Sequence, residues 1–403
     1  MSSFFRNIPL LSICQAMMMT SNSLIITTSA LVGFSLADDK SLATLPLASQ
    51  FIATMIMSIP ASYIMNKIGR KQGFMIAVAF GITGSLLATT AIYNKEFWLF
   101  TLATVFFGCF NGFGNYFRFA AADTVEASLK SKAISVVMAG GLIAAFIGPN
   151  LANISKDWLY DSPFAGSYAA LTIAYIITLA ALIFLKLSSH SNELHGTSGP
   201  TRSLASIAKQ PKFIIALICG MFGYGVMSLV MTATPLAMNL HAHPFSDTSF
   251  VIQWHIVAMF APSFFTGSLI KRFGLFSVLL TGTLFGFTCV AINLNGTSVL
   301  HFWIALAFLG LSWNFLFIGA TTLLTETYTD SERAKTQATN EFFVFSTVAI
   351  ASLSAGGLQH LYGWQVVNIG VIPLLVLILT SVIWLKFIES NECYKIKSRL
   401  QET

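Results

Sequence analysis

The sequence contains few charged residues. Only 9% of its 403 residues are Asp, Glu, Lys or Arg, whereas about a quarter of the residues of an ordinary soluble domain are charged. Hydrophobic residues make up 55%, and the mean hydropathy is +0.74. These values exclude a water-soluble globular domain and predict a protein that crosses a membrane several times.

The common signatures of enzymes are also missing. The sequence has no glycine-rich phosphate loop followed by Lys and Ser or Thr, no His-Glu-x-x-His zinc motif and no Gly-x-Ser-x-Gly nucleophile motif. Its five cysteines fall in four separate apolar segments and near the C-terminus, so no disulfide framework is expected. We therefore expect no enzyme, no bound cofactor and no metal site.

Long apolar segments are abundant. A helix that spans a bilayer needs about 20 apolar residues, and twelve segments reach that length. Their approximate limits are 8–35, 42–65, 73–93, 97–122, 132–153, 166–187, 212–238, 248–270, 275–295, 299–323, 336–358 and 364–387. The sequence therefore predicts an all-α membrane protein.

Lys and Arg are distributed unevenly between the loops. With the N-terminus in the cytoplasm, only Lys40, Lys95 and Lys156 lie on the outer side, and only Arg118 lies within a span. All the other basic residues then lie on the cytoplasmic side. Such a bias sets the orientation in the membrane and predicts that both termini are cytoplasmic. The net charge of +6 is thus explained by topology and does not indicate nucleic-acid binding.

Two short basic turns occupy equivalent places in the two halves of the chain, at 62–71 and 267–276. Each joins two apolar spans and contains a glycine, Gly69 or Gly274, that permits a tight reversal. The repetition predicts a duplicated membrane unit.

These turns resemble the signature loop of the major facilitator superfamily, Gly-x-x-x-Asp-Arg-x-Gly-Arg-Lys/Arg, which follows the second helix and has a degenerate copy after the eighth. The residues at signature positions are Asn66 (in place of the aspartate), Lys67, Gly69, Arg70 and Lys71 in the first copy, and Gly267, Arg272 and Gly274 in the second. The resemblance implies two pseudo-symmetric six-helix bundles around a central cavity. It also implies a cytoplasmic gate at these turns.

The predicted organisation has four parts. An N-terminal six-helix bundle covers 1–187, a cytoplasmic linker covers 188–211, a C-terminal bundle covers 212–388, and a tail covers 389–403. Near the end of the linker, apolar residues at helical spacing among basic ones predict a short helix on the membrane surface.

Three charged residues near the inner ends of spans are candidates for the gate. Arg118 lies within a span, where a charge needs a partner. It either anchors the helix end by pairing with Asp123 or contacts a substrate carboxylate or the gate. Glu341 lies about two turns from the inner end of its span. It either complements the helix dipole and meets the basic turn at 67–71, or takes part in transport.

Two residues are candidates for carrying a proton. His255 lies about two turns into its span, and its intrinsic pKa suits proton transfer, although a hydrogen-bonded packing role explains it equally well. The second candidate is Glu341, because deeply placed carboxylates are often functional in transporters.

Polar and aromatic residues in the spans are candidates for lining the central cavity. They are Gln15, Asn22, Asn115, Tyr116, Tyr224, His255, Trp313 and Asn314. Gly148 and Pro149 resemble the fifth-helix motif of superfamily antiporters, which favours export.

The resemblance implies a secondary transporter that moves a small organic solute across the bacterial inner membrane by alternating access. No nucleotide-binding segment is found, so a proton or other ion gradient would drive transport by a single chain in the lipid bilayer. We expect efflux of a drug or metabolite. Two alternatives are import of a polar metabolite or metal chelate, and a non-transporting sensor on the same scaffold, suggested by the altered signature loop.

Overall fold

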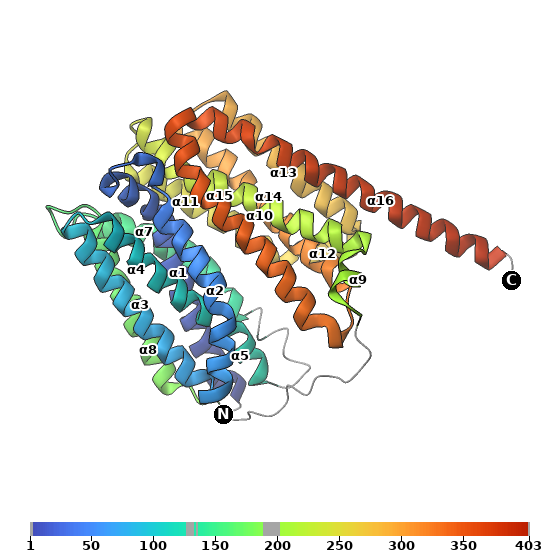
Figure 1. Cartoon of the computed structure of the whole chain (residues 1–403), viewed down its shortest axis with the longest axis horizontal. Coiled ribbons are helices and arrows are strands. Elements are labelled where there is room, and N and C mark those ends of the chain that lie inside the picture. The colour runs from blue at the N-terminus through green and yellow to red at the C-terminus, as the bar shows by residue number, and fades with distance from the viewer. Residues whose placement is uncertain (1–2, 126–132, 134–135, 188–201, 402–403) are drawn as a thin grey trace.

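The computed structural model describes residues 3–125, 133, 136–187 and 202–401. Within them the chain is helical apart from turns and short loops, as Figure 1 shows. The first half contains α1 (Ser3–Leu36), η1 (Lys40–Leu42), α2 (Leu45–Ile68), α3 (Arg70–Tyr93), α4 (Phe97–Gly114), α5 (Phe117–Asp123), α7 (Gly140–Ser155) and α8 (Ala165–Phe184). The prediction of an all-α protein is confirmed.

The second half follows a short helix, α9 (Leu204–Ala208). It contains α10 (Pro211–Leu240), α11 (Phe245–Phe260), α12 (Ser263–Phe273), α13 (Leu275–Asn295), α14 (Val299–Thr325), η3 (Asp330–Glu332), α15 (Arg333–Gly370) and α16 (Ile372–Gln401). Helix α9 forms where the short linker helix was predicted. Linker residues 188–201 and the predicted start of the fifth span, except for residue 133, lie outside the described residues. The predicted domain limits stay a prediction.

The described helices account for the twelve predicted spans. Ten are long and apolar enough to cross a membrane, and α11 with α12, bent by 44°, forms an eleventh span. One of the ten runs from Lys335 to Ile388 and is divided at Gly363, where the backbone leaves the helix with φ 80°. Counting its two parts separately gives twelve. Helices satisfy their own backbone groups, which lipid cannot do.

Both basic turns reverse at a glycine with positive φ. Gly69 has φ 89° between α2 and α3, and Gly274 has φ 84° between α12 and α13. Residues with a side chain rarely adopt this conformation, whereas glycine does so readily. The shared geometry at matching places supports the duplication inferred from the sequence.

Two hydrophobic cores hold the molecule together. One is built from residues between Ile8 and Leu185, and the other mainly from residues between Ile207 and Leu385. A third, small cluster of Ala30, Ala43 and Leu236 joins the first half to the second. Each half therefore has its own hydrophobic core, and the contacts that join the two halves are made largely by other residues.

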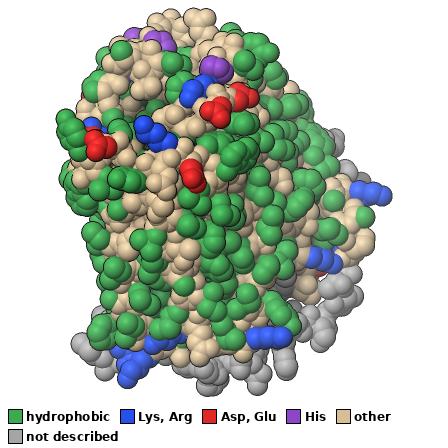
Figure 2. All heavy atoms as spheres, turned by 60° about the vertical axis from the view of Figure 1, so that its left-hand side comes forward, with side chains coloured by type: hydrophobic (Ala, Val, Ile, Leu, Met, Phe, Trp, Pro, Cys, Tyr) green, Lys and Arg blue, Asp and Glu red, His purple; other side chains and the backbone are tan. Residues whose placement is uncertain are grey.

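The two ends of the helix bundle differ. We call the end with the turns at Gly69 and Gly274 the hairpin end, and the end with Lys40, Lys95 and Lys156 the loop end. In Figure 2 only blue Lys and Arg side chains stand out at the lower end, whereas the upper end carries red, blue and purple ones. On the face that Figure 2 shows, Lys and Arg side chains thus gather at the hairpin end.

Hydrogen bonds join the halves at the loop end. Thr44 Oγ1 donates to Leu353 O at 3.2 Å and accepts from Gly356 N at 3.1 Å. Asn150 Nδ2 donates to Gln253 Oε1 at 2.6 Å. The rings of Phe164 and Phe245 also meet there, with centroids 4.8 Å apart. The loop end is therefore closed.

Candidate functional site

A cavity of about 180 Å³ lies between the two halves. This is smaller than the usual volume of pockets that bind small molecules, about 300–1000 Å³. Helices α1, α2, α4 and α7 of the first half and α10, α11, α14 and α15 of the second contribute its lining. None of the lining residues is charged, so the cavity suits a neutral ligand.

Three amide side chains meet on the first-half wall. Asn22 Oδ1 accepts from Gln50 Nε2 at 2.9 Å and from Asn111 Nδ2 at 2.7 Å. All three residues line the cavity. Gln50 Oε1 and Asn111 Oδ1 are buried and have no partner in the described structure. Buried polar groups are normally paired, so these oxygens mark a place where a ligand can bind.

The second-half wall is aromatic and rich in methionine. Tyr224 lies edge-on to Trp313 with centroids 5.4 Å apart, and Phe260 lies 6.0 Å from Trp313. The remaining large apolar side chains on this wall are Met227, Met231, Ile256, Met259 and Phe345. Aromatic faces and polarizable thioethers pack well against flat rings. The cavity thus places amides on one side and aromatic rings on the other.

Arg118 and Glu341 lie toward the hairpin end from this cavity. Arg118 follows the lining residue Asn115 by three positions, and Glu341 precedes the lining residue Phe345 by one helical turn. The two charges interact electrostatically across the halves. Glu341 is nevertheless exposed to solvent. Water therefore reaches between the halves at the hairpin end, while the loop end is closed.

Four of the eight predicted cavity residues line the cavity: Asn22, Asn115, Tyr224 and Trp313. The structure places the other four, Gln15, Tyr116, His255 and Asn314, outside its lining. Their functional roles stay predictions.

The side chains of Asn314 and Tyr116 are engaged in packing. Asn314 Nδ2 donates to Met259 O at 2.6 Å and to Ser263 Oγ at 2.7 Å, which holds α14 against the bend between α11 and α12. Tyr116 donates from its hydroxyl to Ser58 O at 3.0 Å. Both residues therefore tie helices together within one half.

His255 is completely buried between α11 and α14. Its Nδ1 lies 2.7 Å from Leu306 O, and a carbonyl can only accept, so Nδ1 carries a proton. Nε2 is buried without a partner in the described structure. A neutral imidazole with its proton on Nδ1 accounts for both the hydrogen bond of Nδ1 and the unpaired Nε2. The geometry accounts for the packing role, and the proton-carrier role stays a prediction.

The basic turns make contacts within their own half. Lys67 lies over the ring of Tyr63 at 4.7 Å, and Lys71 Nζ donates to Ile183 O at 2.8 Å and Leu185 O at 2.9 Å. In the second turn, Arg272 lies over its neighbour's ring, Phe273, at 5.3 Å. Asn66 is exposed, and Arg70 is half-buried.

The gate candidates are only partly described. Among the described residues, a Cβ built at Gly69, Gly267 or Gly274 meets no atom within 4 Å beyond its own chain neighbours and local helix backbone, so both turns leave room beside them. The side chain of Asp123 lies outside the described residues. The predicted gate role of all these residues stays a prediction.

The fifth-helix motif lies at the interface of both halves. A Cβ at Gly148 would come within 2.6 Å of Ser23 Cβ, so α7 approaches α1 closely there. Pro149 O accepts a hydrogen bond from Ser249 Oγ of α11 at 2.7 Å. The motif thus supports packing beside the cavity, and its link to export stays a prediction.

Several cavity residues were not predicted from the sequence. Gln50 and Asn111 are polar residues inside apolar spans, which is a usable signal, but their meeting with Asn22 depends on how three helices are rotated. The aromatic residues Phe260 and Phe345 carried no signal, because the sequence holds 36 phenylalanines.

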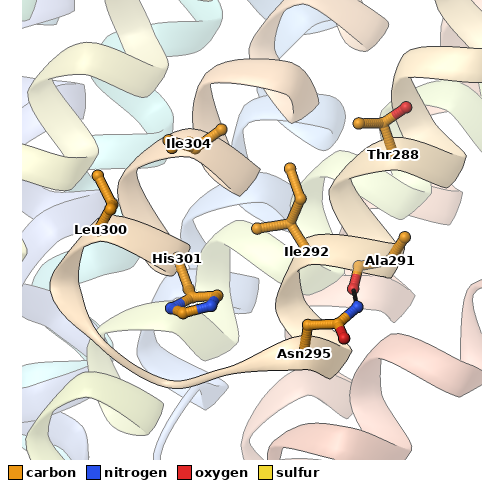
Figure 3. Close-up of a pocket in the computed structure, with 7 residues that line it drawn as sticks. All are labelled: Thr288, Ala291, Ile292, Asn295, Leu300, His301 and Ile304. Carbon is orange, nitrogen blue, oxygen red and sulfur yellow. Dashed lines mark hydrogen bonds between the residues drawn. The ribbon is translucent and has the colours of Figure 1, made fainter.

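A second hollow lies at the loop end between α13 and α14, and Figure 3 shows its lining. His301 Nδ1 lies 2.7 Å from Ser298 Oγ, and Asn295 Nδ2 donates to Ala291 O at 2.7 Å. These polar groups are satisfied locally. The hollow lies within one half, so a ligand there would not pass between the halves.

Comparisons with known proteins agree with this architecture. A family model described as Major Facilitator Superfamily matches residues 11–294. Riboflavin transporter RfnT of Brucella anthropi is 39% identical over 382 residues, 94% of this chain and 95% of the relative. The uncharacterized MFS-type transporter YdeG of Bacillus subtilis is 26% identical over 83% of this chain and 80% of its own. A solved structure of a nucleoside transporter NupG mutant matches with TM-score 0.72 at 13% identity, covering 93% and 98% of the two chains.

The chain belongs to the major facilitator superfamily, and the predicted family and fold are confirmed. It is a multi-pass membrane protein and a secondary transporter of a small molecule, not an enzyme.

Proposed function

We propose that this protein carries riboflavin, or a metabolite with a similar flat heteroaromatic ring, across the membrane by alternating access. The observation that carries the proposal is the uncharged cavity between the halves, with amides on one wall and aromatic rings on the other. A flavin has a flat apolar face and a polar heterocyclic edge, which match these two walls. The similarity to a riboflavin transporter supports the same substrate class.

The proposed orientation has the hairpin end in the cytoplasm. Basic residues gather there, and an excess of Lys and Arg in short loops marks the cytoplasmic side. Both termini are then cytoplasmic in a bacterial inner membrane, and the structure represents the inward-facing state. The translocation path lies within one chain, so a monomer suffices. Efflux, favoured by the motif at Gly148 and Pro149, stays a prediction.

Proton coupling is proposed to act through Glu341. This carboxylate faces water at the hairpin end and interacts with Arg118 of the other half. Proton binding neutralises it and removes this attraction between the halves, which links protonation to their relative motion. His255 is completely buried, whereas Glu341 is exposed to solvent, so Glu341 is better placed to exchange protons with the cytoplasm.

Counterflow in proteoliposomes tests the substrate. Vesicles loaded with unlabelled riboflavin should accumulate labelled riboflavin transiently, and vesicles without protein should not. Imposed pH gradients of both signs then report direction and coupling. Riboflavin that binds without any counterflow would support the sensor alternative, and absence of both binding and counterflow would rule out riboflavin as the substrate.

A further inference from the structure

We infer that Asn22, Gln50 and Asn111 form a subsite that recognises a neutral imide edge, a ring N–H beside ring carbonyls. This inference deepens the proposed function, because it treats the cavity as the substrate site. It assigns specificity to a set of side chains that come from three different helices, α1, α2 and α4.

The shared hydrogen bonds fix how the three amides point. Asn22 Oδ1 receives one N–H from Gln50 at 2.9 Å and one from Asn111 at 2.7 Å. Rotating the amide of Gln50 or Asn111 by half a turn would place its oxygen, in place of its nitrogen, beside Asn22 Oδ1. Two oxygens at hydrogen-bond distance with no hydrogen between them repel each other. The carbonyl oxygen of Asn22 is therefore saturated, and the orientation of the whole cluster follows from it.

This orientation leaves a defined set of groups for a ligand. Gln50 is 1% exposed and Asn111 is 6% exposed, and the side-chain oxygen of each has no partner in the described structure. Asn22 is half-exposed, and within the described chain its Nδ2 donates to no protein acceptor. The subsite thus offers two acceptors and one donor centre. Unpaired buried acceptors are costly, so a ligand that supplies an N–H relieves that cost.

An imide edge fits this set better than other polar groups. Its N–H donates to Gln50 or Asn111, and an adjacent carbonyl accepts from Asn22. A carboxylate would meet two oxygens and be repelled. A cation would lack a countercharge, since no cavity-lining residue is charged. The part of the ligand that binds this subsite is consequently neutral and carries both a hydrogen-bond donor and an acceptor.

The opposite wall limits the rest of the ligand to a flat ring. Trp313 Nε1 is buried and without a partner in the described structure, and the rings of Trp313, Tyr224 and Phe317 all pack against one another. A heteroaromatic ring held at its imide edge would extend toward these rings. One acceptor on its far side would satisfy the indole N–H.

The test compares ligands that differ only at the imide. Riboflavin and 3-methylriboflavin, in which a methyl group replaces the imide proton, are titrated against the purified full chain by flavin fluorescence. The wild-type protein should prefer riboflavin by about tenfold, as expected for one hydrogen bond to an otherwise unpaired buried group. In the double variant Gln50→Met with Asn111→Leu, which removes both acceptors, the preference should fall toward one.

A matched control separates recognition from folding. Asn293 is a buried amide that donates to Asn368 at 2.8 Å, and neither residue lines the cavity. Asn293→Leu should keep the preference for riboflavin, even where it lowers thermal stability. Loss of preference in this variant as well would overturn the assignment.

The inference and the proposed function can fail separately. Equal binding of riboflavin and its methyl derivative would overturn the imide subsite while leaving flavin transport intact. If riboflavin does not bind, lumichrome and uridine are each compared with their imide-methylated forms by thermal shift. Stabilisation by an unmethylated imide alone would then support the subsite without riboflavin, and no such preference would overturn it.

Discussion

Arg202 and Glu332 form a bidentate ion pair between residues 130 positions apart. Arg202 Nε lies 2.9 Å from Glu332 Oε1, and its terminal nitrogen lies 2.7 Å from Oε2. The backbone N of Arg202 also donates to Oε1 at 2.8 Å, and the Glu332 side chain is only 1% exposed. The pair joins the chain just before α9 to the turn before α15. The pair therefore holds the segment that leads into the second half against the hairpin end of that half.

Removing the charge of Glu332 should destabilise the protein. Glu332→Gln keeps the shape of the side chain but weakens three charge-assisted hydrogen bonds from Arg202, so the melting temperature in detergent should fall by several degrees. The matched control is Glu326→Gln. Glu326 pairs with Lys212 at 3.1 Å, but its side chain is 47% exposed, and exposed pairs contribute little. Equal losses in both variants would contradict this ranking.

The same pair predicts a pH dependence. Hydrogen bonds from Arg202 and from the backbone N–H of Thr329 hold the pKa of Glu332 well below its ordinary 4.5. The pair's contribution is therefore complete above pH 4.5 and is lost as the pH falls below that value. The gap in melting temperature between wild type and Glu332→Gln should be constant near neutral pH and should narrow below pH 4.5. An unchanged gap in acid would argue against the low pKa.

Close packing beside the cavity should make Gly148 intolerant of substitution. A Cβ there would lie 2.6 Å from Ser23 Cβ and 2.9 Å from Thr20 O. Gly148→Ala should therefore cost about 1–3 kcal/mol, as overpacked substitutions do, and lower the melting temperature. Gly267→Ala is the control, because Gly267 sits in α12 and a Cβ built there meets no described atom outside its own helix within 4 Å. That variant should be neutral or slightly stabilising.

Proton coupling should depend on Glu341 and not on His255. Glu341→Gln should keep riboflavin counterflow, which needs no gradient, and should lose the response to an imposed pH gradient. His255→Gln should keep that response, because His255 is completely buried and cannot exchange protons with water as the exposed Glu341 can. Measuring flux with and without a pH gradient checks both variants. A Glu341→Gln protein that still responds to pH would exclude this carboxylate as the carrier.

The fold could be predicted from the sequence because its signals are local. An apolar run of about 20 residues reports a span wherever it occurs. The two glycine turns at Gly69 and Gly274 report the duplication by themselves, and both adopt the positive φ that the turn requires. Such features need no knowledge of how helices pack.

The cavity was less predictable because helix rotation and helix breaks decide which side chains face it. The chain breaks its helix after Gly114, so Asn115 lines the cavity while Tyr116 bonds to Ser58. Likewise, α11 bends by 44° into α12, and Asn314 is used to hold that bend. Spacing along an ideal helix does not capture either effect.

The role of Arg118 also depended on tertiary contacts. The sequence left its partner open between Asp123 in the same segment, a substrate carboxylate and the gate. In the structure, Arg118 interacts electrostatically with Glu341, which lies more than 200 residues further along the chain. A long-range pair of this kind has no signal in a single sequence.

Alternating access requires the loop end and the hairpin end to open in turn around the cavity, so closing the loop end permanently must stop transport. A Cβ at Gly356 would lie 2.8 Å from Thr44 Oγ1, which is bonded to the Cβ of Thr44, so the two Cβ atoms are close enough for a disulfide between Thr44→Cys and Gly356→Cys. The decisive measurement is riboflavin counterflow by this double variant before and after reduction, with each single variant as a control. We expect that the oxidised protein binds riboflavin but shows no counterflow, and that reduction restores counterflow. Counterflow at the wild-type rate by fully cross-linked protein would contradict the account.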